Sequence, residues 1–498
     1  MERWGTPKLF AGLTALALAA AACSGNHTGS STAAQKGSTQ QVQAGGGAST
    51  TTTGATGSTA PTGSGAVSGA GASVGTPGAA PGAAASATGG AAPTSPAAGP
   101  PVAGTQQTTA GGFHYTAANL FPASQDRVGI TANQITLCMH APLIFGPAFQ
   151  DSATDFQVYW QYLNSQGGIF GRKVNMVFTD DQYTPSGGVQ AAQQCQQSNP
   201  FLMTAGVGFD TVPAVRQWAE QNHVLYLSSF ATENGLYNLR YTFQLQPSVE
   251  QFGAVAGRYV AARYPGKVGV IWRNSPNWQG GRDSFEAAVR AKGSKVVADV
   301  PVQENQGDYT QAILAMQSAG AQTVLAWVNV LEFDQLEKQA AAQGYHPRWV
   351  TATFNLVTQT LGHDIDGSNG PAAVGLWVTP EYHNGDTTSP WSGEEKVMQQ
   401  AYARYDAKHT ITDTDWQAWL AFKQLARMLS DCGQDCTRNK LAGMLLAGYK
   451  VDLAPLCTED FSRGRGRLGS FAFDVSEATN RSGTVGWKQV ATCAESFQ

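Results

Sequence analysis

The stretch Leu163-Asn-Ser-Gln-Gly-Gly-Ile-Phe-Gly-Arg-Lys-Val174 runs from the end of a helical pattern into a short apolar strand. The helical pattern covers residues 151–165, and the apolar run that follows covers residues 174–179. Gly167 and Gly168 lie between them, where glycine allows the backbone to make a tight turn. A helix joined to a strand in this way is the unit from which α/β folds are built.

The same alternation continues along the chain. Further short apolar runs are typical of strands, and the segments between them repeat apolar residues at intervals of three and four, as helices do. The expected strands are residues 134–140, 201–204, 224–228, 268–272, 296–300 and 323–328, and the expected helices are residues 188–197, 212–222, 250–264, 282–292 and 309–319. This pattern predicts parallel sheets covered by helices, with ligands bound in loops beyond the carboxyl ends of the strands.

The N-terminus has the pattern of an export signal. Two basic residues precede an apolar run over residues 9–22 that ends in small residues, as in a secretory signal peptide. Cys23 follows directly and resembles the cysteine of a bacterial lipobox, whose thiol is acylated, although Ala20 stands where that motif usually has Leu. We predict a lipoprotein signal peptide over residues 1–22 and a lipid anchor at Cys23. An ordinary signal peptide with an incidental cysteine is the alternative.

Residues 23–112 have the composition of a flexible tether. They are almost entirely Gly, Ala, Ser, Thr, Pro and Gln, and Lys36 is their only charged side chain. A segment so poor in large apolar residues cannot offset its conformational entropy by forming a core. Its root-mean-square span is roughly 50 Å, which suits a protein that works some way out from a membrane anchor. Simple spacing and solubilisation are the alternative role.

From Phe113 onward the composition becomes that of a globular body. Aromatic and charged residues appear, and residues 113–498 exceed what one core usually holds, so two lobes are expected. The formal net charge of −4 is small, and no basic stripe indicates nucleic-acid binding. No second long apolar run indicates a membrane span. We therefore expect an exported protein held at the outer face of the cytoplasmic membrane.

The cysteines predict disulfides. The chain has seven, and removing Cys23 leaves six, an even number for an oxidising compartment. Six cysteines allow fifteen pairings. We favour Cys432–Cys436, which would bridge a short loop, and Cys457–Cys493, which would tie down the C-terminal segment. By elimination, the third bridge would be Cys138–Cys195. No second cysteine or histidine pair follows at zinc-ligand spacing, so no metal is expected.

One six-residue motif is a false lead. Residues 464–469, Gly-Arg-Gly-Arg-Leu-Gly, match the spacing of a dinucleotide-binding loop but lack the preceding apolar strand and the following amphipathic helix. We interpret Arg463, Arg465 and Arg467 as a solvated turn.

Several of the predicted loops match one family. The stretch quoted first, followed by Asp-Asp-x-x-x-Pro at residues 180–185, is the most specific element. Together with Ala141-Pro-Leu-Ile-Phe-Gly-Pro147, Ala205-Gly-Val-Gly208 and Tyr264-Pro-Gly-Lys-Val-Gly-Val-Ile271, it resembles the type I periplasmic binding proteins. The likeness is to the substrate-binding components of branched-chain amino acid ABC transporters, and it spans about residues 128–498.

The resemblance implies an α/β fold of two lobes, each a parallel sheet flanked by helices, joined by a three-segment hinge. One lobe would comprise residues 113–246 and about 374–455, the other about 247–373 and 456–498. A small polar molecule (an amino acid, an amide or a related compound) would bind between the lobes and favour the closed state. The expected partners are this ligand, an ABC permease and the membrane through a lipid anchor. We expect a monomer without cofactor, metal or catalytic residues.

The resemblance places ligand contacts in the loop after Gly208. The family often has a serine there that accepts the ligand carboxylate, and the nearest residues in this chain are Asp210 and Thr211. An aspartate at this position would repel a carboxylate and favour an ammonium, an amide or a hydroxyl. Both residues are also candidates to cap the helix that begins near Val212.

The next loop of the first lobe, residues 228–234, matches a Ser-Pro-Ala-Ala-Thr stretch of the family. The match makes Thr232 and the backbone of Ala231 candidate ligand contacts. Phe145 and Phe230 are candidates for an aromatic surface against the ligand, with anchoring of their loops as the alternative.

In the second lobe the resemblance carries over only in part. Trp278 lies near the position of a cleft tyrosine, and packing between helices is its alternative role. A second tyrosine and the ammonium-binding acid of the family fall near Asn329 and Phe354–Asn355, where this chain has no acid. A simple Leu/Ile/Val ligand is therefore not expected, whereas the architecture is.

Three functions compete. The first is a solute-binding lipoprotein that feeds an ABC importer. The second is a tethered sensor of the same fold, which the long linker favours because delivery to a permease does not need such reach. The third is an enzyme on this scaffold, whose turnover would depend on Asp210 or His140. We favour the first, which is not an enzyme.

Overall fold

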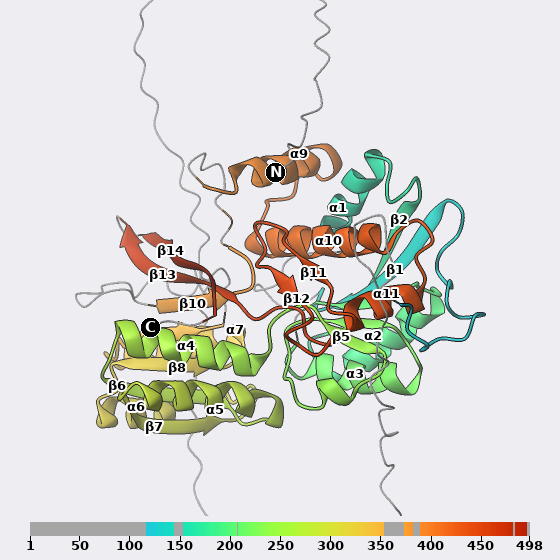
Figure 1. Cartoon of the computed structure of the whole chain (residues 1–498). Coiled ribbons are helices and arrows are strands. Elements are labelled where there is room, and N and C mark those ends of the chain that lie inside the picture. Colours follow the sequence, from blue (N-terminus) through green and yellow to red (C-terminus); the bar gives the residue numbers. More distant parts are fainter. Residues whose placement is uncertain are drawn as a thin grey trace, which may run out of the picture. The chain divides into compact units, whose positions relative to one another are not determined.

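The computed structural model describes residues 116–143, 153–206, 208–352, 373–380, 382, 389–481 and 484–495 (Figure 1). All of them belong to one of the two units of the chain, residues 89–498. The predicted signal peptide, Cys23 and the linker lie outside the described residues, as do Phe145 and Phe354, so their roles stay predictions.

The first sheet has five parallel strands in the order β2-β1-β3-β4-β5. Successive residues of β1 point to opposite faces, as the strand period of two requires: Leu137 packs with one core cluster and Cys138 with another. Helices therefore cover both faces. The elements are β1 (Gln134–Ala141), α1 (Ala153–Ser165), β2 (Lys173–Asp180), α2 (Pro185–Gln197), β3 (Met203–Ala205), α3 (Thr211–Gln221), β4 (Tyr226–Ser228) and β5 (Thr242–Gln244).

The second sheet has seven strands in the order β14-β13-β10-β9-β8-β6-β7. Its elements are α4 (Val249–Arg263), β6 (Lys267–Arg273), α5 (Pro276–Ala291), β7 (Lys295–Val302), α6 (Thr310–Ala319), β8 (Thr323–Trp327), α7 (Val330–Ala342), β9 (Arg348–Thr351), β10 (Ala373–Trp377), β13 (Phe473–Arg481) and β14 (Thr484–Ala494). The strands from β10 to β7 are parallel, which confirms the predicted α/β class. The hairpin β13–β14, dark red in Figure 1, extends the sheet antiparallel and was not expected.

A later part of the chain completes the first lobe. Its elements are α9 (Ser392–Tyr405), α10 (Asp413–Cys432), α11 (Arg438–Leu446), β11 (Lys450–Val451) and β12 (Glu459–Asp460). Helix α10 packs on α1 through aromatic side chains: the ring centroid of Trp160 lies 5.2 Å from that of Phe422, and that of Tyr159 lies 5.0 Å from that of Trp419. None of the helices in the described part of the chain is both long and apolar enough to cross a membrane.

Among the described elements, the chain passes from one lobe to the other after β5, after β10 and after β12. Because β10 pairs with β9 and β13, it belongs to the second sheet, so the second crossing falls after the boundary expected near residue 374. Phe461 packs in the first-lobe core, so the third crossing also falls later than residue 456.

The first and third crossings lie side by side. The Gln244 amide donates to the Arg467 carbonyl at 2.7 Å, and the Gly469 amide donates to the Gln244 carbonyl at 2.9 Å. The Arg467 side chain donates to the carbonyls of Arg240 and Thr242 and is only 8% exposed. The interpretation of a solvated turn is therefore wrong for Arg467, whose pKa burial lowers to about 10.

Glycine permits close packing of α4 on α5 in the second lobe. A Cβ atom at Gly253 would lie 2.0 Å from the carbonyl oxygen of Gly281, and one at Gly281 would lie 2.7 Å from the Trp327 ring. A side chain at Gly253 would push α4 and α5 apart, and one at Gly281 would push α5 away from β8. The close approach holds α5, whose first turn faces the other lobe, at a defined position over β8.

The three disulfides of the structure are the pairs that the sequence favours. Cys138 of β1 is joined to Cys195 of α2, Cys432 to Cys436 at the end of α10, and Cys457 to Cys493 of β14. The Cα–Cα distances of 5.6, 5.2 and 5.3 Å are ordinary for disulfides. The first bridge fastens α2 to its sheet, and the third spans the third crossing.

Loop length predicts unequal contributions of two bridges to stability. In the chain-entropy model, a bridge with a sequence separation of 57 residues, as in Cys138–Cys195, contributes about 4 kcal/mol, whereas the separation of 4 residues in Cys432–Cys436 gives about 2 kcal/mol. Replacing each pair by alanines should therefore lower the free energy of unfolding more for the first pair, as measured by urea denaturation. A larger loss for the short-loop pair would contradict this expectation.

Candidate functional site

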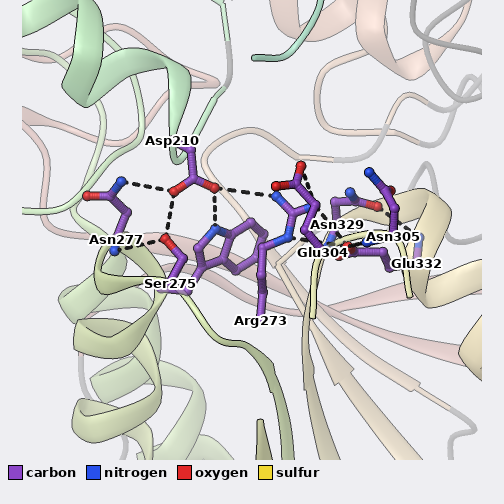
Figure 2. Close-up of polar contacts among 9 residues, drawn as sticks. Asp210, Arg273, Ser275, Asn277, Glu304, Asn305, Asn329 and Glu332 are labelled. Carbon is purple, nitrogen blue, oxygen red and sulfur yellow. Dashed lines mark hydrogen bonds and ion pairs between the residues drawn. The ribbon is translucent and has the colours of Figure 1, made fainter. Parts of the chain in front are cut away.

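The candidate site lies where the carboxyl ends of strands from the two sheets meet. In the first lobe, β3 is followed by a loop that contains Phe209 and Asp210 and leads into α3. In the second lobe, β6 ends at Arg273, and a short turn leads into α5. Side chains of these two loops contact each other directly (Figure 2).

The Asp210 carboxylate accepts hydrogen bonds from four side chains of the other lobe. Its Oδ1 atom accepts from Ser275 Oγ at 2.8 Å and from Asn277 Nδ2 at 2.9 Å. Its Oδ2 atom accepts from Trp278 Nε1 at 2.8 Å and from Arg273 Nη1 at 3.4 Å. We call these five residues the Asp210 site.

The local sequence explains why the second-lobe donors point to one place. Ser275 caps α5 by accepting from the Asn277 amide at 3.4 Å, and Pro276 begins the helix. The cap therefore directs the first turn of α5, including Asn277 and Trp278, toward the other lobe. The positive end of the helix dipole lies at this turn and favours a carboxylate.

Asp210 does not cap its own helix. It occupies the N-cap position of α3, but within the described structure its side chain makes no capping hydrogen bond. Its backbone is helical there (φ −100°, ψ −32°), whereas a capping residue is usually extended. The capping role is therefore not what the structure shows: the Asp210 side chain contacts the other lobe instead, and its contact with a ligand stays a prediction.

Arg273 is surrounded by three carboxylates. Its Nη2 atom lies 2.8 Å from Glu332 Oε1 and 3.2 Å from Glu304 Oε1, in addition to the Asp210 contact (Figure 2). Burial by itself would lower the pKa of Arg273, but the neighbouring acidic groups, Glu332 foremost and Glu304 after it, together outweigh burial, so the pKa is raised. Glu332 is in turn held by the backbone amides of Asn305 and Asn329, both at 2.9 Å.

Phe209 accompanies Asp210 into the second lobe. Although it belongs to a first-lobe loop, it is 5% exposed and part of the second-lobe core. Its ring centroid lies 4.5 Å from that of Trp278, 5.0 Å from that of Phe230 and 5.2 Å from that of Trp327. Phe230 and Trp278 are fully buried in this aromatic cluster, and Trp278 both packs there and donates to Asp210.

Three of the other expected ligand contacts have internal partners: Ala231, Thr232 and Asn329. The Ala231 carbonyl accepts from the Val249 amide at 3.1 Å, and Thr232 Oγ1 donates to Glu250 at 2.6 Å. Asn329 caps α7. Thr211 is 1% exposed, and its Oγ1 atom has no hydrogen-bond partner among the residues described.

Sequence reasoning found two members of the Asp210 site and missed three. Asp210 and Trp278 were expected near the ligand, and the structure brings them together. Arg273, Ser275 and Asn277 were missed. The Ser-Pro-Asn sequence directly after a strand is a signal for a capped helix start, and it would have pointed to this loop.

His140, considered for an enzyme, is engaged within the first lobe. It is fully buried, with Nδ1 2.8 Å from Asp181 Oδ2 and Nε2 2.6 Å from the Tyr226 hydroxyl. Both ring nitrogens are thus occupied by neighbours on β4 and after β2, as expected of a packed histidine.

A small cavity lies at the hinge. Its volume of about 20 Å³ has room for one water molecule or slightly more. Glu459, which is 2% exposed, lines it and accepts a hydrogen bond from Gln424. Burial raises the pKa of Glu459 to about 8, although the Gln424 bond lowers it somewhat. The cavity is lined from all three crossings, by residues that include Gln246, Pro247, Val378, Thr379, Cys457 and Ser470.

Two groups of described side chains have the spacing of a metal site, and one of them contains the disulfide-bonded Cys457 and Cys493. In the other group, the ligand atoms of Asp155, Asp406 and His409 lie within 4.8 Å of one another. His409 Nε2, however, lies 2.7 Å from Asp415 Oδ2, and its Nδ1 atom lies 3.4 Å from Asp155. A hydrogen bond with Asp155 raises the pKa of Asp406. These contacts account for the group as an internal network between α1 and the turn before α10.

Comparison with known proteins identifies the family. A family model described as a periplasmic binding protein matches residues 144–473, which is more than half of the chain. The chain therefore belongs to the periplasmic binding protein family, and the resemblance noted in the sequence is confirmed.

Individual relatives are more distant. The Leu/Ile/Val-binding protein homolog 1 of Brucella abortus (strain 2308) is 28% identical over 224 residues, which cover 44% of this chain and only 58% of that protein. A fatty acid ABC transporter substrate-binding protein from Thermomonospora curvata has a TM-score of 0.61 at 15% identity. The match covers 74% of this chain and 95% of the Thermomonospora chain. The LivJ protein from Streptococcus pneumoniae, in complex with isoleucine, has a TM-score of 0.57 at 15% identity. The match covers 72% of this chain and 99% of the LivJ chain. The structural likenesses show the fold alone.

Phe209 should contribute strongly to stability. Replacing it by Ala leaves a void among Phe230, Trp278 and Trp327, so we expect the free energy of unfolding to fall by about 3 to 5 kcal/mol. The matched control is Phe170→Ala, because Phe170 is 43% exposed and its loss should change the value by no more than about 0.5 kcal/mol. Urea denaturation measures both, and similar losses would show that Phe209 is not packed as described.

Glu459 should make stability fall as pH rises. Its folded-state pKa of about 8 lies above the ordinary value of 4.5, so between these values the folded protein binds more protons than the unfolded chain. Glu459→Gln removes this titration. The stability of the variant relative to the wild type should therefore be greater at pH 8 than at pH 5, as measured by thermal or urea unfolding. Asp474, whose pKa burial raises to about 7, titrates in both proteins and cancels in the comparison. A pH-independent difference would be inconsistent with a buried, protonated Glu459.

Proposed function

We propose that the protein is a solute-binding lipoprotein that captures a small polar molecule between its lobes and delivers it to an ABC importer. The observation that carries the proposal is the Asp210 site, where polar side chains from the carboxyl ends of both sheets converge. Ligands of open α/β sheets bind at such ends. The acylated Cys23 would hold the protein at the outer face of the cytoplasmic membrane.

The mechanism follows from the contacts between the lobes. Apart from Phe209 and Phe230, which first-lobe loops place in the second-lobe core, each lobe has its own apolar core. Separation of the lobes at the three crossings would therefore withdraw these two side chains and leave the rest of each core intact. Separation exposes the polar ends of the strands to solvent. A solute that binds both lobes favours the closed state in proportion to its greater affinity for that state, and a permease would bind the closed form.

The names of the relatives suggest which solutes to test. They include proteins named for Leu, Ile and Val, for fatty acids and for aromatic acids such as 4-hydroxybenzoate. These names belong to those proteins, and they define a panel of amino acids, short amides, fatty acids and aromatic acids for this one.

A tethered sensor of the same fold is the second candidate. It is favoured by the length of the linker over residues 23–112, which exceeds what delivery to a permease requires. Genes for a permease and an ATPase beside this gene would support import, and a regulatory gene in that place would support sensing.

Thermal unfolding of the protein in the presence of the panel tests the proposed binding. A solute bound only by the folded state stabilises it by about 2.7 kcal/mol at one hundred times its dissociation constant, so one chemical class should raise the midpoint. Asn277→Ala, which removes a donor of the Asp210 site, should weaken the effect. Gln279→Ala, an exposed position on the same helix, should not. A folded protein whose midpoint no solute raises would overturn the proposal.

A further inference from the structure

We propose that residues 273–278 form a carboxylate-binding site, that Asp210 is its intramolecular occupant, and that a solute carboxylate competes with Asp210 for it. This inference deepens the proposed function and rests on it. It assigns a solute class, carboxylic acids, to the second lobe, and it gives Asp210 the part of an internal competitor.

The number and direction of the donors describe a complete carboxylate site. An ionised carboxylate accepts about four hydrogen bonds, two on each oxygen. Asp210 receives four, two on Oδ1 and two on Oδ2, from donors that all lie in one six-residue segment. One donor is a guanidinium and one an indole N–H, both buried, where hydrogen bonds to a charged group are strong.

The donors are held by partners in their own lobe. The Arg273 side chain is 4% exposed and is anchored by Glu332 at 2.8 Å. The Trp278 carbonyl accepts from Trp327 Nε1 at 2.6 Å. Ser275 is oriented by its capping of α5. Since none of these contacts involves Asp210, the site should persist when the lobes separate and remain available to another carboxylate.

The Asp210 carboxylate is suited to leave the site. It makes no capping bond within the described part of α3, so its departure breaks no contact of its own helix. Its side chain is 19% exposed and therefore reachable from solvent. Phe209, packed beside it, supplies the apolar contact that now holds this loop against the second lobe.

The charges around Arg273 make the two carboxylates mutually exclusive. Glu304 and Glu332 already pair with Arg273, so a solute carboxylate cannot add to Asp210 without close repulsion between like charges. It has to replace Asp210. In this proposal Asp210 disfavours acids by occupying their donors, in place of the direct repulsion expected from the sequence. The apparent affinity for acids is then the intrinsic affinity multiplied by the fraction of protein in which the donors are free of Asp210.

Acetate is the simplest probe of the site. In Asp210→Ala the four donors lose their occupant, so sodium acetate should raise the unfolding midpoint in a saturable way, relative to sodium chloride at the same ionic strength and pH 7. The wild type should respond only at acetate concentrations about tenfold higher or more. Adding Asn277→Ala to Asp210→Ala should weaken acetate binding by about tenfold, the effect of losing one hydrogen bond to a charge. Gln279→Ala, the exposed control, should leave it unchanged.

Each outcome decides the inference. Equal acetate responses of the wild type and Asp210→Ala, or a response that Asn277→Ala leaves unchanged, would overturn it. If Asp210→Ala does not fold, Asp210→Asn keeps the shape of the occupant without its charge, and it should still respond to less acetate than the wild type. A positive solute panel without an acetate response would overturn only this inference. An acetate response with a negative panel would overturn only the proposed function.

Discussion

The two lobes are joined most specifically by one carboxylate. A charge that is mostly withdrawn from water is stable only when its hydrogen-bonding capacity is satisfied. The side chain of Asp210 is 19% exposed, and its hydrogen bonds come from Arg273, Ser275, Asn277 and Trp278 of the other lobe. The four hydrogen-bond distances from the Asp210 carboxylate therefore define where the loop after β3 lies relative to the loop after β6. Phe209, the neighbouring residue in the same loop, packs in the second-lobe core against Phe230, Trp278 and Trp327.

This contact differs in kind from the apolar packing within each lobe. The cores of the two lobes are separate clusters, and each is complete without the other except for Phe209 and Phe230, which enter the second-lobe core from first-lobe loops. Apolar packing is not directional, whereas four hydrogen bonds on one carboxylate are. The interface thus combines a non-directional apolar contact with directional hydrogen bonds to one carboxylate. In such an interface, another carboxylate can replace that of Asp210 as the acceptor of the hydrogen bonds.

Much of the fold was predictable from local patterns, and the exceptions have a common cause. The strand and helix periodicities agree with the structure because neighbours in sequence determine them. Of the disulfides only Cys432–Cys436 is local, whereas the cysteines of the other two bridges lie 57 and 36 residues apart. The hairpin β13–β14, the place of β10 in the second sheet and the burial of Arg467 were not predicted. Each depends on pairing with residues far away in the chain: β13 with β10, and Arg467 with the segment before α4.

By itself the sequence determined the α/β class, because the periodicity of apolar residues carries that information. Local motifs were enough to indicate the family, an export signal and the two loops in which Asp210 and Trp278 lie. Only the tertiary structure decided what Asp210 does. A carboxylate at the start of a helix can cap it, bind a solute or pair with another lobe, and the local sequence is compatible with all three. Its donors lie more than sixty residues away, and folding brings them within 3.4 Å, so the choice is made by the packing of the lobes.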